Sequence, residues 1–160
     1  MRSLCSALLL LALLLACPSG AAAAQAGDKP EFDMHAPYVR YHFADGDMDF
    51  TFGSVVLGST TNGGCEIGEA FATAAAIKDG DAASWQEEWL KMAARTEARG
   101  EQSLAGGHKV SARQQLMRAS NYYRIGLMAM LPDDPRLPKT GLKARALMRN
   151  TDLDASAVAR

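Results

Sequence analysis

The sequence contains few cysteines, and their positions limit the covalent chemistry that the chain can carry out. Two of the three, Cys5 and Cys17, lie in the first 26 residues, so the rest of the chain holds only Cys65. A single cysteine excludes an internal disulfide there. Packing of a small side chain at the start of a helix is a more common role for such a residue than nucleophilic catalysis.

Patterns typical of metal, nucleophile and cofactor sites are also missing. The three histidines show no metal-ligand spacing such as H-E-x-x-H; they are His35, His42 and His108. No G-x-S-x-G turn is present to raise a serine toward a base. The chain also lacks a phosphate-binding loop. We therefore assign no catalytic residue, no metal site and no cofactor.

Neither sign of charge dominates. The chain has 17 Lys and Arg against 18 Asp and Glu, a net charge of −1. Removal of the first 26 residues takes away one Arg and no acid, which leaves 16 bases and 18 acids. This balance excludes the basic footprint of a nucleic-acid-binding domain.

The first 26 residues have the pattern of a secretory signal peptide. One Arg precedes about a dozen apolar residues, followed by small residues up to Ala24 or Ala26. The apolar run is shorter than the ~20 residues that a membrane-spanning helix needs. We expect export to the periplasm or the cell exterior. Alternatively "LLAC" is a lipobox, in which Cys17 is acylated and anchors a lipoprotein; contact with a membrane is expected only in that case.

Residues 27–61 show few helical signals and are predicted to form an irregular arm with one or two short elements. The alternating stretch "DMDFTFGSVVLG" would suit a short strand, which needs a partner such as "YVRYHF". The expected strand therefore depends on formation of a hairpin.

Residues 62–136 show helical periodicity and are predicted to form antiparallel hairpins. One apolar stripe comprises Ile67, Phe71, Ala74 and Ile77, and a second comprises Trp85, Trp89, Met92, Ala93 and Thr96. Between them, Gly80 suits a left-handed helix terminus and Asp81 suits a helix cap.

A third helix is predicted after the paired glycines at 106 and 107. Ser111 and Gln114 have the spacing of a capping box, and "LPDDP" ends the helix at Pro132. Its apolar stripe is Leu116, Ala119, Tyr123, Leu127 and Met130. Residues 137–160 are predicted to be a linker with a short helix. The predicted fold class is mainly α.

Four segments, in this order and spacing, resemble a known family: "NGGCEIGEAF", "IKDGDAASWQEEW", "GHKVSARQQLMRASNYYRIG" and "LPDDPR". They are similar to the helical N-terminal region of α/β-hydrolases that include 2,6-dihydroxypseudooxynicotine hydrolase and esterase-like relatives of the fermentation/respiration switch protein. The resemblance covers roughly residues 40–158, and residues 137–160 look like the segment leading toward the catalytic sheet.

The resemblance implies a cap domain over the active-site cleft of a serine esterase or an acyl or C–C bond hydrolase. In that family the catalytic serine, acid and histidine come from the following sheet domain, which we expect to be absent here, so that the chain alone is inactive. By resemblance Glu69, Tyr122 and Tyr123 face the substrate, with packing as their alternative role. The expected partner is a separate hydrolase catalytic domain or another protein. The alternative function is a free-standing helical module or lipoprotein that binds a protein partner.

Overall fold

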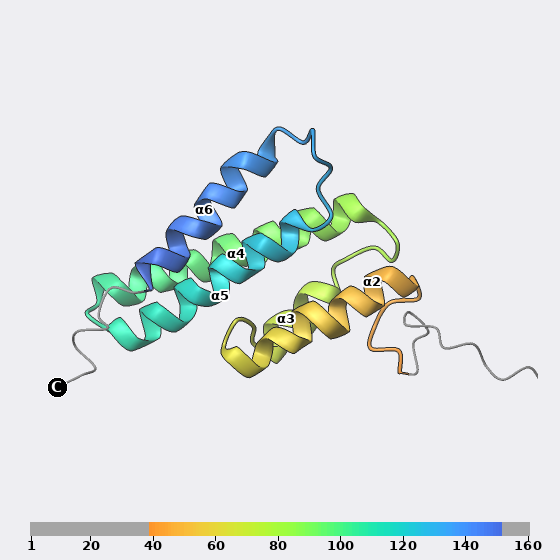
Figure 1. Ribbon diagram of the computed structural model, residues 1–160. Coiled ribbons are helices and arrows are strands. Elements are labelled where there is room, and N and C mark those ends of the chain that lie inside the picture. The colour runs from red at the N-terminus through yellow and green to blue at the C-terminus, as the bar shows by residue number, and fades with distance from the viewer. Residues whose placement is uncertain (1–38, 152–160) are drawn as a thin grey trace, which may run out of the picture. The chain divides into compact units, whose positions relative to one another are not determined.

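The protein is helical throughout the range that the computed structural model describes, residues 39–151, and no β-strand occurs within that range. The prediction of a mainly α fold is therefore confirmed. The leader, with Cys17, lies outside the described residues. The helices are α2 (Gly46–Thr51), the π-helical turn η1 (Phe52–Val56), the 3₁₀ helix η2 (Leu57–Asn62), α3 (Ile67–Ala74), α4 (Ala82–Ala105), α5 (Lys109–Leu127) and α6 (Arg136–Asn150) (Figure 1).

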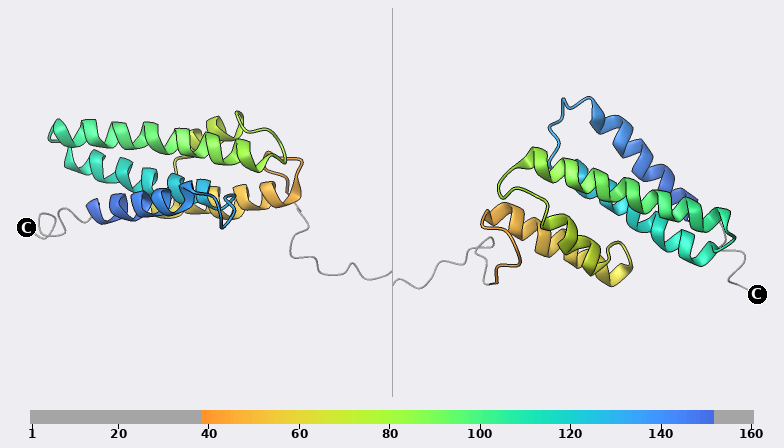
Figure 2. Two further views of the ribbon diagram at one scale, coloured as in Figure 1. Left: turned by 90° about the horizontal axis from the view of Figure 1, so that it is seen from above. Right: turned by 180° about the vertical axis from the view of Figure 1, so that it is seen from behind.

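Helices α4 and α5 form an antiparallel hairpin and lie side by side along their length (Figures 1 and 2). The carboxylate of Asp81 accepts a hydrogen bond from the Ser84 amide at 3.0 Å, which confirms the predicted cap of α4. A Cβ atom added to Gly100 would lie 2.7 Å from Leu116 Cδ2. A glycine is therefore needed at this position for the two helices to approach so closely.

The predicted stripe of α4 is confirmed as core. All five of its side chains are buried: Trp85, Trp89, Met92, Ala93 and Thr96. The Trp89 ring lies 5.8 Å from the Trp85 ring and 5.5 Å from the Tyr122 ring, measured between centroids. Aromatic rings of this size contribute a large share of the apolar area that a small domain can bury.

Helix α5 differs from its prediction at both ends. It begins at Lys109 with His108 as the capping residue, so Ser111 lies inside the first turn and the predicted capping box is wrong. The helix ends at Leu127, before Pro132. Helix α6 then runs from residue 136, and its buried Ala144 and Leu147 lie on the side that packs against α5. It is longer than the short helix predicted after residue 137.

The prediction of an irregular arm, or of a strand, is wrong for residues 46–62. These residues form the continuous helical run of α2, η1 and η2, in which Phe52 and Val56 are fully buried. The two side chains are one helical turn apart, so they share a face. The alternation "DMDFTF" imitated a strand because polar and apolar residues happen to alternate along a helix that is buried on two sides.

Buried carboxylates fix the chain before this helical run. Asp49, 1% exposed, accepts hydrogen bonds from the backbone amides of residues 41–43 at 3.0, 2.7 and 2.8 Å. Asp79, between α3 and α4, accepts from the amides of residues 44 and 45 at 2.7 and 2.9 Å. Five consecutive amides thus end on two carboxylates, and residues 41–45 are held against both α2 and the loop after α3.

The stripe predicted for α3 is wrong. Ile67 and Phe71 are 58% and 40% exposed, and the buried residues are instead Ala70, Thr73 and Ala74. The helix is turned so that Glu69 points inward, and this rotation carries the two bulky side chains outward. Gly80 does adopt a positive φ of 72°, but in the loop between α3 and α4 rather than at the end of a helix. No helix within residues 39–151 is long and apolar enough to cross a membrane.

Candidate functional site

Two of the three residues predicted to face a substrate meet where α3 packs on the hairpin. The hydroxyl group of Tyr122, on α5, donates a hydrogen bond to Glu69 Oε2 at 2.6 Å. The same hydroxyl oxygen accepts from the backbone amide of Glu66 at 3.0 Å. Tyr122 is completely buried, whereas 12% of the Glu69 side chain remains exposed. Tyr122 therefore orients Glu69 rather than presenting its own surface to solvent.

Two arginines complete the surroundings of Glu69. Arg118 Nε donates to Glu69 Oε2 at 3.1 Å, and Arg99 donates from the other side to Oε1. The Arg118 side chain is 19% exposed and the Arg99 side chain 50% exposed. We refer to Glu69, Tyr122, Arg118 and Arg99 as the Glu69 cluster. Sequence reasoning missed both arginines, although Arg118 lies one helical turn before Tyr122 and therefore shares its face.

The loop before α3 is pinned to the same region of α5. Asn121 Nδ2 donates to the Gly64 carbonyl at 2.9 Å and to Ser59 Oγ at 3.1 Å. A Cβ atom on Gly64 would lie 3.0 Å from Asn62 Oδ1 and 3.2 Å from Asn121 Nδ2, so a side chain does not fit without displacing them. The "NGG" segment therefore folds tightly against the α5 residues next to Tyr122.

Cys65 is buried beside the start of α3, which confirms its predicted packing position. Burial raises the pKa of its thiol, and the carboxylates of Glu69 and Glu66 raise it further against the opposing hydrogen bond with Tyr122. Burial and the hydrogen bond to Glu69 likewise raise the pKa of Tyr122 well above its ordinary value. Both groups thus stay protonated at neutral pH, so the thiol is unsuited to nucleophilic attack.

Tyr123, the third predicted residue, points elsewhere. Its hydroxyl donates to Glu97 Oε2 at 2.8 Å, and the same oxygen is paired with Lys143 Nζ at 2.7 Å. The Lys143 ammonium also lies 5.1 Å from the centre of the Tyr123 ring. Tyr123 therefore links α4, α5 and α6 and is separate from the Glu69 cluster in this structure.

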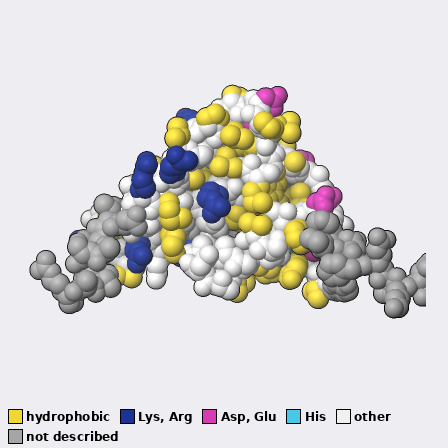
Figure 3. Space-filling model, viewed as in Figure 1, with side chains coloured by type: hydrophobic (Ala, Val, Ile, Leu, Met, Phe, Trp, Pro, Cys, Tyr) yellow, Lys and Arg dark blue, Asp and Glu magenta, His cyan; other side chains and the backbone are white. Residues whose placement is uncertain are grey.

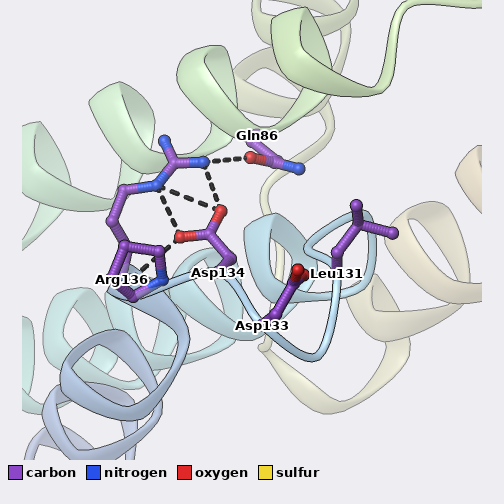
Figure 4. Close-up of a pocket in the computed structure, with 6 residues that line it drawn as sticks. Gln86, Leu131, Asp133, Asp134 and Arg136 are labelled. Atoms are coloured by element: carbon purple, nitrogen blue, oxygen red, sulfur yellow. Dashed lines mark hydrogen bonds and ion pairs between the residues drawn. The ribbon is translucent and has the colours of Figure 1, made fainter.

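A larger hollow lies at the start of α6 (Figure 4). Its volume is about 440 Å³, and its wall carries the chain of Asp134, Arg136 and Gln86. Arg136 Nη2 donates to Asp134 Oδ2 at 2.6 Å and to Gln86 Oε1 at 2.5 Å. Hydrogen bonds from Arg136 lower the pKa of Asp134 to about 2. These contacts pair the polar groups with one another and attach the beginning of α6 to α4.

The described residues do not assemble a catalytic triad or a metal centre. Among residues 39–151, no three His, Cys, Asp or Glu side chains are grouped so as to hold a metal ion. Within the same range His42 packs edge-on against Phe43, and His108 begins α5 without a side-chain cap bond. The buried serine of α5, Ser120, donates to the Ala144 carbonyl at 2.7 Å. The Glu69 cluster offers a held carboxylate and a half-exposed guanidinium, which suit polar recognition.

Comparison with known proteins gives partial matches to hydrolases. No protein-family model matches the chain. The α/β hydrolase gkaG of Penicillium citrinum is 37% identical over 82 residues, which are 51% of this chain and 19% of the relative. The α/β hydrolase xenA of Xenoacremonium sinensis is 34% identical over 99 residues, 61% of this chain and 23% of the relative.

A third relative, the 20-hydroxy-prefusarin hydrolase FUS2 of Gibberella moniliformis, is 37% identical over 97 residues, 59% of this chain and 23% of the relative. The resemblance to α/β-hydrolases is therefore confirmed over about half of this chain. The chain spans about a fifth of the length of these relatives.

Proposed function

We propose that this chain supplies the helical cap of an α/β-hydrolase and is catalytically inactive by itself. The proposal rests on one observation: the chain is similar to α/β-hydrolases over about half its length, yet residues 39–151 are all-helical. The nucleophile of an α/β-hydrolase stands on a sharp turn from a strand to a helix. A helical segment without this turn can shape a substrate cleft but cannot hold the nucleophile.

In this role the cap would cover the cleft of a serine esterase or of an acyl or C–C bond hydrolase. A cap excludes water and contributes the polar groups that orient a substrate. Glu69, Tyr122 and Tyr123 are our candidates for this surface. Tyr122 and Arg118 hold the Glu69 carboxylate, so its position is fixed before a substrate arrives. Such prior fixing lowers the entropy that binding must lose.

A replacement experiment tests the cap function. In the Penicillium citrinum hydrolase gkaG, the segment similar to this chain would be deleted or replaced by residues 39–151. We expect deletion to lower the melting temperature and the rate of labelling by a serine-reactive fluorophosphonate, and replacement to restore both. The full chain alone should remain unlabelled, because its sequence has no nucleophile elbow.

Two results would contradict the proposal. Stoichiometric labelling of the pure full chain would show that it carries its own nucleophile. A replacement protein no better than the deletion would mean that these helices do not function as a cap. If the full chain were at the same time folded and monodisperse, a free-standing interaction module would be the better interpretation.

We also propose that the chain is exported, either soluble or lipid-anchored. The proposal is supported by the short apolar run near the N-terminus and the small residues that follow it. Mass spectrometry of the exported protein should show a new N-terminus near Gln25 or Gly27, or a diacylglyceryl group on Cys17. An exported protein that retains Met1 would contradict both forms.

A further inference from the structure

The outer side of α3 is apolar and exposed. Ile67 is 58% and Phe71 40% exposed, and Ala72 and Ala75 are exposed between them and the far edge of the helix. We call these four residues the α3 face. The Phe71 ring packs at 5.3 Å, between centroids, on the buried Phe52 ring, so its exposed edge is held in place. The face is therefore a fixed surface rather than a set of loose side chains.

This face lacks the charges that a solvated helix normally carries on its outer side. The only charged residue of α3 is Glu69. Its carboxylate is bonded to Tyr122, Arg118 and Arg99. The single charge of the helix is thus compensated from within the same fold. A helix that is apolar on both its inner and outer sides is typical of one that is covered on both.

We propose that the α3 face packs against an uncharged, apolar surface of the sheet domain of an α/β-hydrolase. This inference rests on the proposed cap function. In the relatives the similar segment is only about a fifth of a hydrolase chain, so a much larger body accompanies it there. Helices that flank a mostly parallel sheet are covered by that sheet through apolar contacts. The α3 face has the neutral, apolar chemistry that such contact requires.

Charge argues against an anionic lipid surface as the occupant. Anionic lipids attract Lys and Arg, and none lies in α3. The basic residues gather instead on α6, whose sequence has five and no acid, and Figure 3 shows Lys and Arg side chains over this helix and the neighbouring α5. The α3 face and the basic surface therefore belong to different parts of the fold.

The Glu69 cluster makes such docking less costly. Covering a free carboxylate would remove its hydration, whereas a carboxylate already bonded to two guanidinium groups loses less on burial. Arg99, half-exposed, would then stand at the edge of the contact. Docking would thereby bring the Glu69 cluster to the border of the sheet domain, where a cap residue can meet a substrate.

Ile67→Asp tests the inference, with Val110→Asp as a matched control. Both residues are exposed and β-branched, and both lie in the first turn of a helix, where aspartate is tolerated. Leu131→Asp probes the competing apolar surface beside the connection to α6, where Leu131 is 69% exposed. In the full chain alone, all three variants should melt like the parent protein.

In the replacement hydrolase described above, only Ile67→Asp should be damaging. We expect it to reduce the rate of fluorophosphonate labelling at least about tenfold and to lower the melting temperature, because an unpaired carboxylate would be buried in the contact. Val110→Asp and Leu131→Asp should retain both properties of the parent replacement protein.

The possible contrary results have different meanings. If Leu131→Asp is damaging and Ile67→Asp is not, the inference is overturned while the cap function stands. If the parent replacement protein fails to restore the hydrolase, the cap function falls and the inference falls with it. If light scattering shows that the full chain is a dimer and that Ile67→Asp makes it monomeric, a second copy of this chain covers the face, and the inference is again overturned.

Discussion

Trp89→Ala should unfold the helical hairpin or bring it close to unfolding. The Trp89 side chain is completely buried between the Trp85 and Tyr122 rings. Truncation of a buried tryptophan typically costs ~3–5 kcal/mol, against a total stability of ~5–15 kcal/mol for a small domain. Urea melts followed by circular dichroism should show a large fall in the midpoint.

Conservative variants separate packing from hydrogen bonding in this core. Trp89 Nε1 has no hydrogen-bond partner, so Trp89→Phe should lose only contact area. Trp85 Nε1 donates to the Ile125 carbonyl at 3.1 Å, so Trp85→Phe should cost about 1–3 kcal/mol more by leaving that carbonyl unpaired. Lys91→Ala, on the exposed side of α4, should leave the midpoint unchanged. Small and equal effects of Trp85→Ala and Trp89→Ala would contradict the assignment of this stripe as core.

Asp49→Ala should detach residues 41–45 from α2 and destabilise the protein strongly. The Asp49 carboxylate accepts three backbone amide hydrogen bonds in a buried position. Hydrogen bonds to a charged group contribute about 1.5–3 kcal/mol each, and amides left without an acceptor add their desolvation cost. We expect a loss of roughly 3 kcal/mol or more in urea melts at neutral pH. Asp47→Ala, one turn away and exposed, is the control and should have little effect.

The contribution of Asp49 should also depend on pH in a defined direction. Burial raises the pKa of its carboxyl, but the amides of residues 41–43, with help from Arg40, lower it by more, so the net pKa lies below 3.8. A lowered pKa in the folded state means that the stabilisation is complete above the unfolded pKa and is lost as the pH falls through the folded value. The stability difference between the parent and Asp49→Asn should therefore shrink below about pH 4. A difference that stays constant down to about pH 2 would contradict this assignment.

Periodicity in the sequence was sufficient where one face of a long helix is buried. The stripe on α4 and the cap at Asp81 followed directly from spacing and residue type. It failed for α3, because the rotation of that helix is set by contacts of Glu69 with residues 30, 49 and 53 positions away. It failed for residues 46–62 because buried positions there face more than one neighbour.

The candidate site was predictable only in part. The resemblance to α/β-hydrolases pointed to Glu69 and Tyr122, which the structure brings into contact. Arg118 shares a face with Tyr122 and was within reach of helical spacing. Arg99 comes from the antiparallel partner helix, so its place depends on the register between α4 and α5. That register is set by the close approach of Gly100 to Leu116, which has no local sequence signature.

The bonds from Asp79 to the amides of residues 44 and 45 join positions 35 and 34 residues apart. They close the segment that contains α2 and α3 into a loop whose two ends meet away from the α4–α5 hairpin. Regions with their own closure can open as cooperative units with a free energy below that of global unfolding. The segment from 44 to 79 should therefore exchange its amide hydrogens together, and earlier than the hairpin. The surface that we assign to docking thus lies on a subunit of the fold that can loosen while the hairpin stays intact.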